Sequence, residues 1–184
     1  MTKAEILASV NATTRRELTD IDTYLIAVLT DISRRTLSLK QELTADSTAD
    51  QNYITAPSDL AAQAIDSLIV DDLEYDAAPL SDVVGTVCRS YVYCLYNGKI
   101  YVYPTLAGEE YTLRYSRLHP ASADSILFPE TYREVIEHGV KARVYEAYEI
   151  TDKMVDQMTL YEAKLARFIG DNALPPVCRP YKGV

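Results

Sequence analysis

The spacing of hydrophobic residues changes twice along the chain and divides it into three regions. Near the N-terminus, apolar side chains recur at intervals of three and four residues, which is the period of an amphipathic helix. This pattern predicts helices over residues 1–43, with Thr2 as the cap of the first helix and Thr19-Asp20 as the start of the second. Residues 44–59 are small and polar, so we expect a loop there.

A two-residue period replaces the helical one in residues 60–120 and predicts β-strands. The strongest signal is Asn97-Gly98 between two alternating segments, because a type I′ turn requires positive φ at both central residues. The turn implies four cross-strand pairs: Leu95 with Ile100, Tyr93 with Val102, Cys94 with Tyr101, and Val92 with Tyr103. Both faces of this hairpin are apolar or aromatic, so we expect it to be covered on both sides.

Two further turns extend the β region. The Asp-Asp pair at 71–72 separates two short β-forming segments and predicts a second tight hairpin. A turn at Ala107-Gly108 leads into another strand over residues 110–115. We therefore expect a small antiparallel β-meander.

The helical period returns in residues 121–169, where Pro129 suits a first helical turn. The pattern restarts at Thr151-Asp152, which favours a helical hairpin over one long helix. Three prolines follow in residues 170–184 and exclude regular structure, so we expect an extended tail there.

These elements predict an α+β protein. Its N-terminal helices and C-terminal helical hairpin form a helical bundle, with the small antiparallel β-meander inserted and an extended C-terminal tail. The predicted boundaries within one overall domain are 1–43 for the N-terminal helices, 44–59 for the loop, 60–120 for the β-rich insert, 121–169 for the helical hairpin and 170–184 for the tail.

Composition narrows the class of protein. The formal net charge of −9 argues against a nucleic-acid-binding surface, which needs clustered Lys and Arg. No apolar run approaches the roughly 20 residues that span a bilayer, and the N-terminus lacks the apolar core of a signal peptide. We therefore expect a soluble protein made in a cytoplasm. The 15 tyrosines suit half-buried strands and subunit interfaces.

Residues capable of catalysis or metal binding do not form a recognisable site. Cys88, Cys94 and Cys178 lack the spacing of a zinc site, and the histidines lie in different elements. The acidic residues around Asp71 fit turn chemistry better than a calcium loop. No phosphate-binding loop or nucleophile motif is present in the sequence. We expect a non-enzymatic protein with no cofactor and no bound metal.

Three segments resemble the tailed-phage head-to-tail connector, or adaptor, family: residues 96–104, 111–120 and 128–143. The likeness extends to residues 1–170 in the order of elements, and in residue detail it is confined to 91–143. These are patterns of a fold and carry no catalytic signature.

The resemblance implies a structural virion protein of the phage neck, assembled in the host cytoplasm. It would form a ring on the portal, usually of twelve copies, extend the DNA channel and present a docking surface to the next neck or tail protein. DNA would pass through the lumen without sequence-specific binding, and no membrane would be involved. In such families the C-terminal segment commonly reaches the portal, which here assigns portal binding to Leu174, Pro175, Pro176, Val177, Arg179, Pro180, Tyr181 and Lys182.

Subunits of a ring meet through two different faces. The candidate interface residues, chosen from the amphipathic helices and the Tyr-rich strands, are Arg34, Arg35, Tyr101, Tyr103, Met154, Met158 and Tyr161. Three alternatives remain open: another neck or tail-completion subunit, a monomeric module that binds an extended peptide along a sheet edge, and a small enzyme or metal protein that uses Cys88, Cys94, His119 or the Asp71 group.

Overall fold

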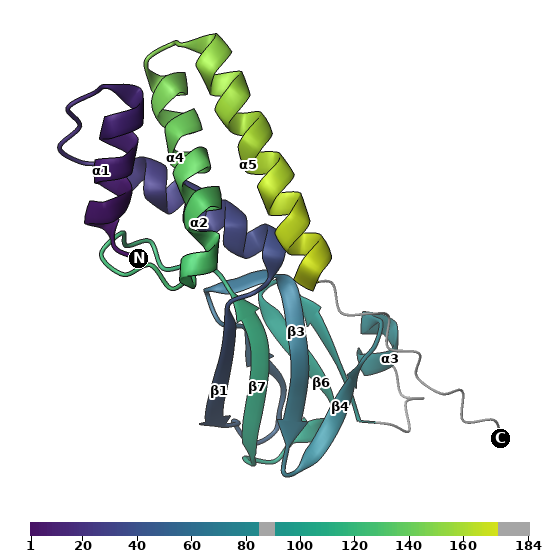
Figure 1. Cartoon of the computed structure of the whole chain (residues 1–184). Coiled ribbons are helices and arrows are strands. Elements are labelled where there is room, and N and C mark those ends of the chain that lie inside the picture. The colour runs from purple at the N-terminus through teal and green to yellow at the C-terminus, as the bar shows by residue number, and fades with distance from the viewer. Residues whose placement is uncertain (85–90, 173–184) are drawn as a thin grey trace. The chain divides into compact units, whose positions relative to one another are not determined.

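The chain folds into two compact units, which Figure 1 shows in a computed structural model that describes residues 1–84 and 91–172. The helical unit combines residues 1–36 with the described residues from 121 onward. The β unit consists of residues 37–120, of which 85–90 are not described. Each unit has its own buried apolar core.

In its described residues, the helical unit contains four α-helices and a single 3₁₀ turn: α1 (Lys3–Thr14), α2 (Asp22–Thr36), η1 (Glu130–Tyr132), α4 (Arg133–Ala147) and α5 (Thr151–Asn172). In Figure 1, α4 lies between α1 and α5, and it contacts both of them. The core contains Ile6 and Val10 from α1, and Leu25, Leu29 and Ile32 from α2. From the hairpin, Ile136, Val140 and Leu165 complete it.

Local sequence signals determine where the first two helices begin. The Thr2 hydroxyl accepts a hydrogen bond from the Glu5 backbone N–H, and the Glu5 carboxylate accepts one from the Thr2 N–H, which together form a capping box. The Asp20 carboxylate accepts hydrogen bonds from the backbone N–H groups of Ile21 and Asp22. The predicted helix starts at Thr2 and Thr19-Asp20 are confirmed.

The β unit contains one curled seven-stranded sheet and a short helix. Its elements are β1 (Lys40–Asp46), β2 (Gln51–Thr55), β3 (Leu60–Val70), β4 (Leu73–Ala77), α3 (Leu80–Val84), β5 (Val92–Tyr96), β6 (Lys99–Leu106) and β7 (Glu110–Arg117). The strand order is β1-β7-β3-β4-β5-β6-β2. Neighbouring strands are antiparallel except β4 and β5, which are parallel.

Both predicted tight hairpins are confirmed. Strands β5 and β6 pair in the predicted register, with Leu95 opposite Ile100, and Asn97 and Gly98 have positive φ angles of 49° and 71°. Strands β3 and β4 meet across Asp71-Asp72, which also have positive φ angles. A two-residue turn with both central φ angles positive matches the right-handed twist of the strands it joins.

The predicted fold class is wrong about the β structure. A sheet of seven strands with its own core replaces the small meander, so the protein is not a helical bundle with a minor insert. Strand β7 does not continue the β5–β6 hairpin; it pairs with β1 and β3. Strands β1 and β2 occupy residues for which the sequence predicted the end of a helix and a loop. Their pairing partners are more than 40 residues away, and such long-range pairing overrides weak local patterns.

The core of the β unit gathers on one face of the sheet. Eleven buried residues contributed by six strands form it, among them Leu68, Val102 and Leu113. On the other face of the β5–β6 hairpin, Tyr101 and Tyr103 are only half-buried. Val92 on the same face is buried, so the cover expected on both sides is present on this face but only partial.

Helix α5 extends further than its sequence predicted. It continues to Asn172, three residues into the segment that was expected to be extended. Prolines exclude a helix only near their own positions, and the first of them is Pro175. Residues 173–184 lie outside the described residues.

Candidate functional site

A groove in the helical unit brings together three of the predicted interface residues, Arg35, Met158 and Tyr161. Their side chains come from α2 and α5, and Gly139 of α4 lies in the same lining. Helical spacing alone places Arg35 on one helix and the other two on a second helix, more than 120 residues away. The tertiary structure is what makes them neighbours.

Paired charges and hydrogen bonds connect the two sides of this groove. Arg35 donates two parallel hydrogen bonds to the Glu162 carboxylate, at 2.8 and 2.6 Å. The Tyr161 hydroxyl donates to Asp31 at 2.5 Å, and the Tyr161 side chain is buried, at 4% exposure. Bidentate Arg–carboxylate pairs fix orientation as well as distance. The groove therefore joins α2 to α5 within one chain.

The protonation states of these groups follow from their contacts. The hydrogen bonds from Arg35 lower the pKa of Glu162, although partial burial acts in the opposite direction. Burial, followed by the hydrogen bond to Asp31, raises the pKa of the Tyr161 hydroxyl. Tyr161 is therefore a hydrogen-bond donor at neutral pH.

The other four interface candidates do not join this groove. Arg34 is exposed near the end of α2, and Met154 is half-buried in the first turn of α5. Tyr101 and Tyr103 belong to β6 in the β unit, where the Tyr101 ring lies 5.9 Å from that of Tyr53. That all seven residues contribute to subunit contacts stays a prediction.

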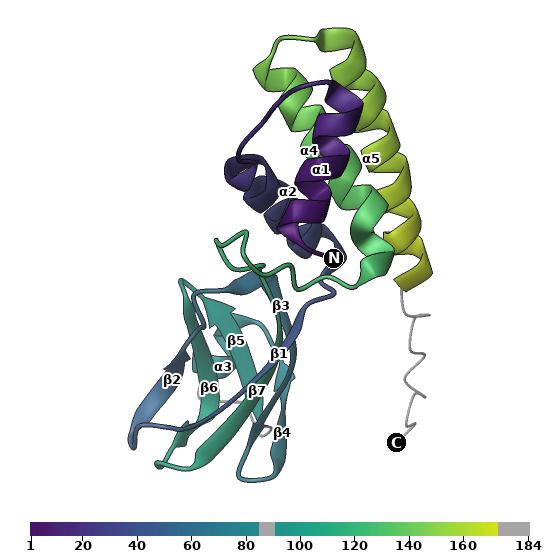
Figure 2. The ribbon, with the colours of Figure 1, turned by 60° about the vertical axis from the view of Figure 1, so that its left-hand side comes forward.

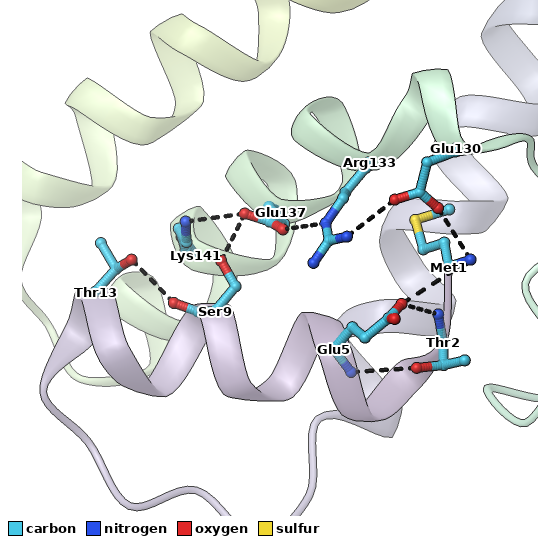
Figure 3. Close-up of polar contacts among 9 residues, drawn as sticks. All are labelled: Met1, Thr2, Glu5, Ser9, Thr13, Glu130, Arg133, Glu137 and Lys141. Atoms are coloured by element: carbon cyan, nitrogen blue, oxygen red, sulfur yellow. Dashed lines mark hydrogen bonds and ion pairs between the residues drawn. The ribbon is translucent and has the colours of Figure 1, made fainter.

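A second polar cluster joins α1 to α4 and centres on Glu137 (Figure 3). The Glu137 carboxylate accepts hydrogen bonds from the Ser9 hydroxyl at 2.6 Å and from Arg133 at 3.0 Å. Lys141 lies 3.4 Å from the same carboxylate, and Arg133 also pairs with Glu130. Glu137 is only 16% exposed, so these contacts hold a charge at the junction of the two helices.

We expect the Glu137 contacts to make the helical unit sensitive to acid. Burial by itself would raise the pKa of Glu137, but the hydrogen bonds from Ser9 and Arg133 and the charge of Lys141 outweigh it, so that the pKa falls below its ordinary value of 4.5. A carboxylate with a lowered folded-state pKa stabilises the fold above its unfolded pKa, and that stability is lost as the pH falls through the folded pKa. Glu137→Gln should therefore reduce the loss of stability between about pH 5 and pH 3.

Thermal unfolding followed by circular dichroism at several pH values measures this effect. Glu146→Gln is the matched control, because Glu146 forms an exposed ion pair with Arg143 on the same helix. We expect this control to keep the wild-type pH profile. If Glu137→Gln keeps it as well, the Glu137 cluster does not contribute to acid sensitivity.

Another groove lies near the end of α5, where the chain continues toward its C-terminal segment. Its lining includes Val135, Lys164 and Phe168, and the Phe168 ring stacks on Tyr132 with 4.5 Å between ring centroids. An ion pair between Lys164 and Glu134 bridges the groove. The predicted portal-binding residues, from Leu174 to Lys182, follow directly in the chain and lie outside the described residues.

The residues considered for catalysis or metal binding remain separate from one another. His119 is buried in the β unit, and His138 in the helical unit contacts Gln157. Cys94 is a half-buried free thiol, and Cys88 and Cys178 lie outside the described residues. Within residues 1–84 and 91–172, no three His, Cys, Asp or Glu side chains are placed to share a metal ion. None of the helices in these ranges combines the length and hydrophobicity needed to cross a membrane.

Sequence reasoning missed several residues that shape the helical unit. Gly139 allows α4 to approach Val28 and Tyr161 closely, and no turn or motif marks it. Val155 and Leu160 are 51% and 43% exposed on α5, although they are large and apolar. The sequence could have indicated that Val155 and Leu160 are exposed, because both lie off the apolar stripe of α5. A helix that packs on one side leaves its opposite side to solvent.

Both polar clusters of the helical unit consist of side chains that pair with one another and hold helices together. A family model described as SU10 adaptor protein matches residues 1–176. The chain therefore belongs to the SU10 adaptor protein family, a family of phage head-to-tail adaptors, which confirms the resemblance noted in the sequence. No curated protein matches the chain.

Proposed function

We propose that this protein forms a ring on the phage portal, extends the DNA channel and presents a docking surface to the next neck or tail protein. The single observation that carries the proposal is the match of a phage adaptor family over residues 1–176. In this role the protein is a non-enzymatic component of the virion neck, assembled in the host cytoplasm. The resemblance implies a ring of twelve copies.

The charge of the chain supports this role. A formal net charge of −9 disfavours tight binding to the DNA backbone, because phosphate contacts require Lys and Arg. DNA can then move through a lumen lined by such subunits without being retained. The same charge keeps free subunits apart and soluble until they meet a partner.

Electron microscopy of purified portal rings mixed with this protein tests the proposal. We expect an additional ring of density on the portal. Quantitative mass analysis of intact virions should find the chain in the copy number of that ring. Portals that stay bare at high protein concentration, or virions that lack the chain, contradict the proposal.

Removal of residues 173–184 should abolish portal docking. The segment carries three prolines, which limit the entropy lost on binding, and two cations, Arg179 and Lys182, in an otherwise acidic chain. We expect portal affinity to fall by more than about a hundredfold, or roughly 2.7 kcal/mol, so that no docking is seen at concentrations that saturate the portal with wild type. The circular dichroism spectrum should not change, because the truncation begins after α5.

A variant with the same twelve residues in scrambled order is the control for length and composition. If the scrambled variant docks like the wild type, charge and proline content are sufficient. If the truncated chain docks like the wild type, portal binding lies elsewhere in the protein.

A second candidate function is a different neck or tail-completion subunit. The same mixing experiment separates the two, because such a subunit would bind completed necks and not bare portals. The third candidate is a monomeric module that binds an extended peptide. The positions of β1 and β2 at the two ends of the strand order favour this candidate, because an extended peptide can pair with an edge strand. A monomeric module of this kind would be absent from purified virions.

A further inference from the structure

We propose that neighbouring copies of this chain meet through the outer faces of α1 and α5, packed antiparallel to each other. This inference rests on the proposed ring and assigns the contact that holds it together. The occupant of the exposed α5 face is then α1 of a second copy. The argument depends on three observations about the helical unit.

The first observation is that α5 leaves two large apolar side chains, Val155 and Leu160, exposed to solvent. Val155 and Leu160 are 51% and 43% exposed, and they lie on either side of Thr159 and Ala163 on the helix surface, which are exposed too. The buried stripe of α5, which includes Tyr161 and Leu165, is on the opposite side. This side of α5 thus combines exposed apolar and charged side chains, and interfaces between proteins are typically as mixed as that.

The second observation is that α1 presents a flat, exposed face of its own. Ala4, Ala8 and Ala12 follow each other at intervals of four residues and lie opposite the buried Ile6 and Val10. Helix α4 lies between α1 and α5 (Figure 1) and contacts both of them. The two exposed faces therefore point to different sides of the helical unit, as a head-to-tail contact around a ring requires.

The third observation is that the charges at the ends of the two faces are complementary. On the α1 face, Glu5 lies near the N-terminal end and Arg15 at the C-terminal end. On the α5 face, Asp152 and Asp156 lie near the N-terminal end and Arg167 near the C-terminal end. Among the described residues, no ion pair involves Arg15, Asp152 or Asp156. Within one chain, α1 and α5 run in opposite directions along α4 (Figure 2). When a rotation relates two copies, α1 of one copy therefore meets α5 of the next copy in an antiparallel orientation.

The spacing of these charges matches. Glu5 and Arg15 are separated by about 15 Å along α1, and Asp156 and Arg167 by about 16 Å along α5, at 1.5 Å per residue. With Arg15 opposite Asp156, this alignment places Ala8 opposite Ala163 and Ala12 opposite Thr159. The alanines of α1 let the two helices approach closely, with Leu160 next to the contact.

Charge reversal tests the contact in rings assembled on portals from the full chain. Arg15→Glu and Asp156→Arg should each weaken ring assembly by about tenfold, and the double variant should recover most of it. Arg143→Glu is the matched control, because Arg143 is an exposed arginine toward the C-terminal end of α4 and belongs to neither face. Like Arg15→Glu, the control reverses one positive charge on a helix of the helical unit, and we expect its rings to assemble as those of the wild type do.

Cysteine cross-linking provides a second, independent measurement. A chain that carries both Ala8→Cys and Ala163→Cys should give a ladder of covalent multimers when assembled rings are oxidised, because a disulfide requires Cα atoms about 4.4–6.8 Å apart. The two single variants report any cross-linking through the native cysteines.

The outcomes separate this inference from the proposed function. If the wild type forms rings but Arg15→Glu behaves like Arg143→Glu and no ladder appears, the contact is wrong and the ring stands. If the wild type forms no ring on portals, both are overturned. Rescue in the double variant together with a ladder in the paired cysteine variant supports the α1–α5 contact.

Discussion

Replacement of Gly139 by valine is expected to unfold the helical unit at a markedly lower temperature than the wild type. A Cβ atom at this position would lie 2.8 Å from Val28 Cγ1 and 3.0 Å from Tyr161 Cε2. Val28 is 3% exposed and stiff because it is branched at Cβ, and the Tyr161 hydroxyl is held by Asp31. Neither neighbour can move aside without losing contacts of its own.

Overpacking of a well-packed core costs about 1–3 kcal/mol and occasionally more, and valine adds three carbons here. We expect the upper end of this range, which lowers Tm by roughly 6–12 °C in a chain of this size. Circular dichroism at 222 nm during heating measures the change, since the helices dominate that signal. Gly139→Ala should fall between the wild type and Gly139→Val.

Gly170→Val is the matched control for this prediction. Gly170 is also helical, and a Cβ atom there would have no neighbour within 4 Å. Valine is a better helix former than glycine, so we expect this variant to be as stable as the wild type or slightly more stable. Equal melting temperatures for Gly139→Val and Gly170→Val would show that the close approach of α4 to α2 and α5 does not exist.

Replacement of Leu113 by alanine is expected to destabilise the β unit by about 2–5 kcal/mol, the range for fully buried leucines. Leu113 lies on β7, is 0% exposed and faces Leu43 of β1 on one side and Leu68 of β3 on the other. Truncation removes the middle member of this row and leaves a cavity that its neighbours cannot fill without shifting the strands. Chemical denaturation followed by tyrosine fluorescence measures the loss, because the chain has no tryptophan.

Thr112→Ala is the control on the adjacent position of the same strand. Thr112 points to the other side of the sheet and shares an exposed hydrogen bond with Thr44. We expect it to cost less than about 1 kcal/mol. If Leu113→Ala is no more destabilising than Thr112→Ala, the row of leucines is not the centre of the β core.

The residues of the helical groove illustrate the limit of sequence reasoning about the site. Arg35, Met158 and Tyr161 were chosen because they fit an interface, and the structure places them together with partners inside the same chain. Asp31 also lies 3.5 Å from Arg35, four residues later on α2, a pair that helical spacing could have indicated. The contacts of Asp31 with Tyr161 and of Glu162 with Arg35 join two helices and could not be identified beforehand. Helical periodicity orders residues along one element and carries no information about which elements meet.

The sequence by itself determined features that depend on neighbouring residues. The Thr2 capping box, the Asp20 helix start and the two tight hairpins at Asp71-Asp72 and Asn97-Gly98 all follow from side chains within a few positions of each other. The resemblance to the adaptor family also rested on short segments. Such features form with little loss of chain entropy and hold in many contexts.

Only the tertiary structure decided that residues 40–46 and 51–55 are strands. Both segments are edge strands with weak alternation, and each pairs with a strand more than 40 residues away. It likewise decided that β7 joins β1 and β3 and that α1 and α5 lie on two sides of α4. Burial of a common apolar face sets these arrangements, because the free energy of burial depends on surfaces that distant segments share.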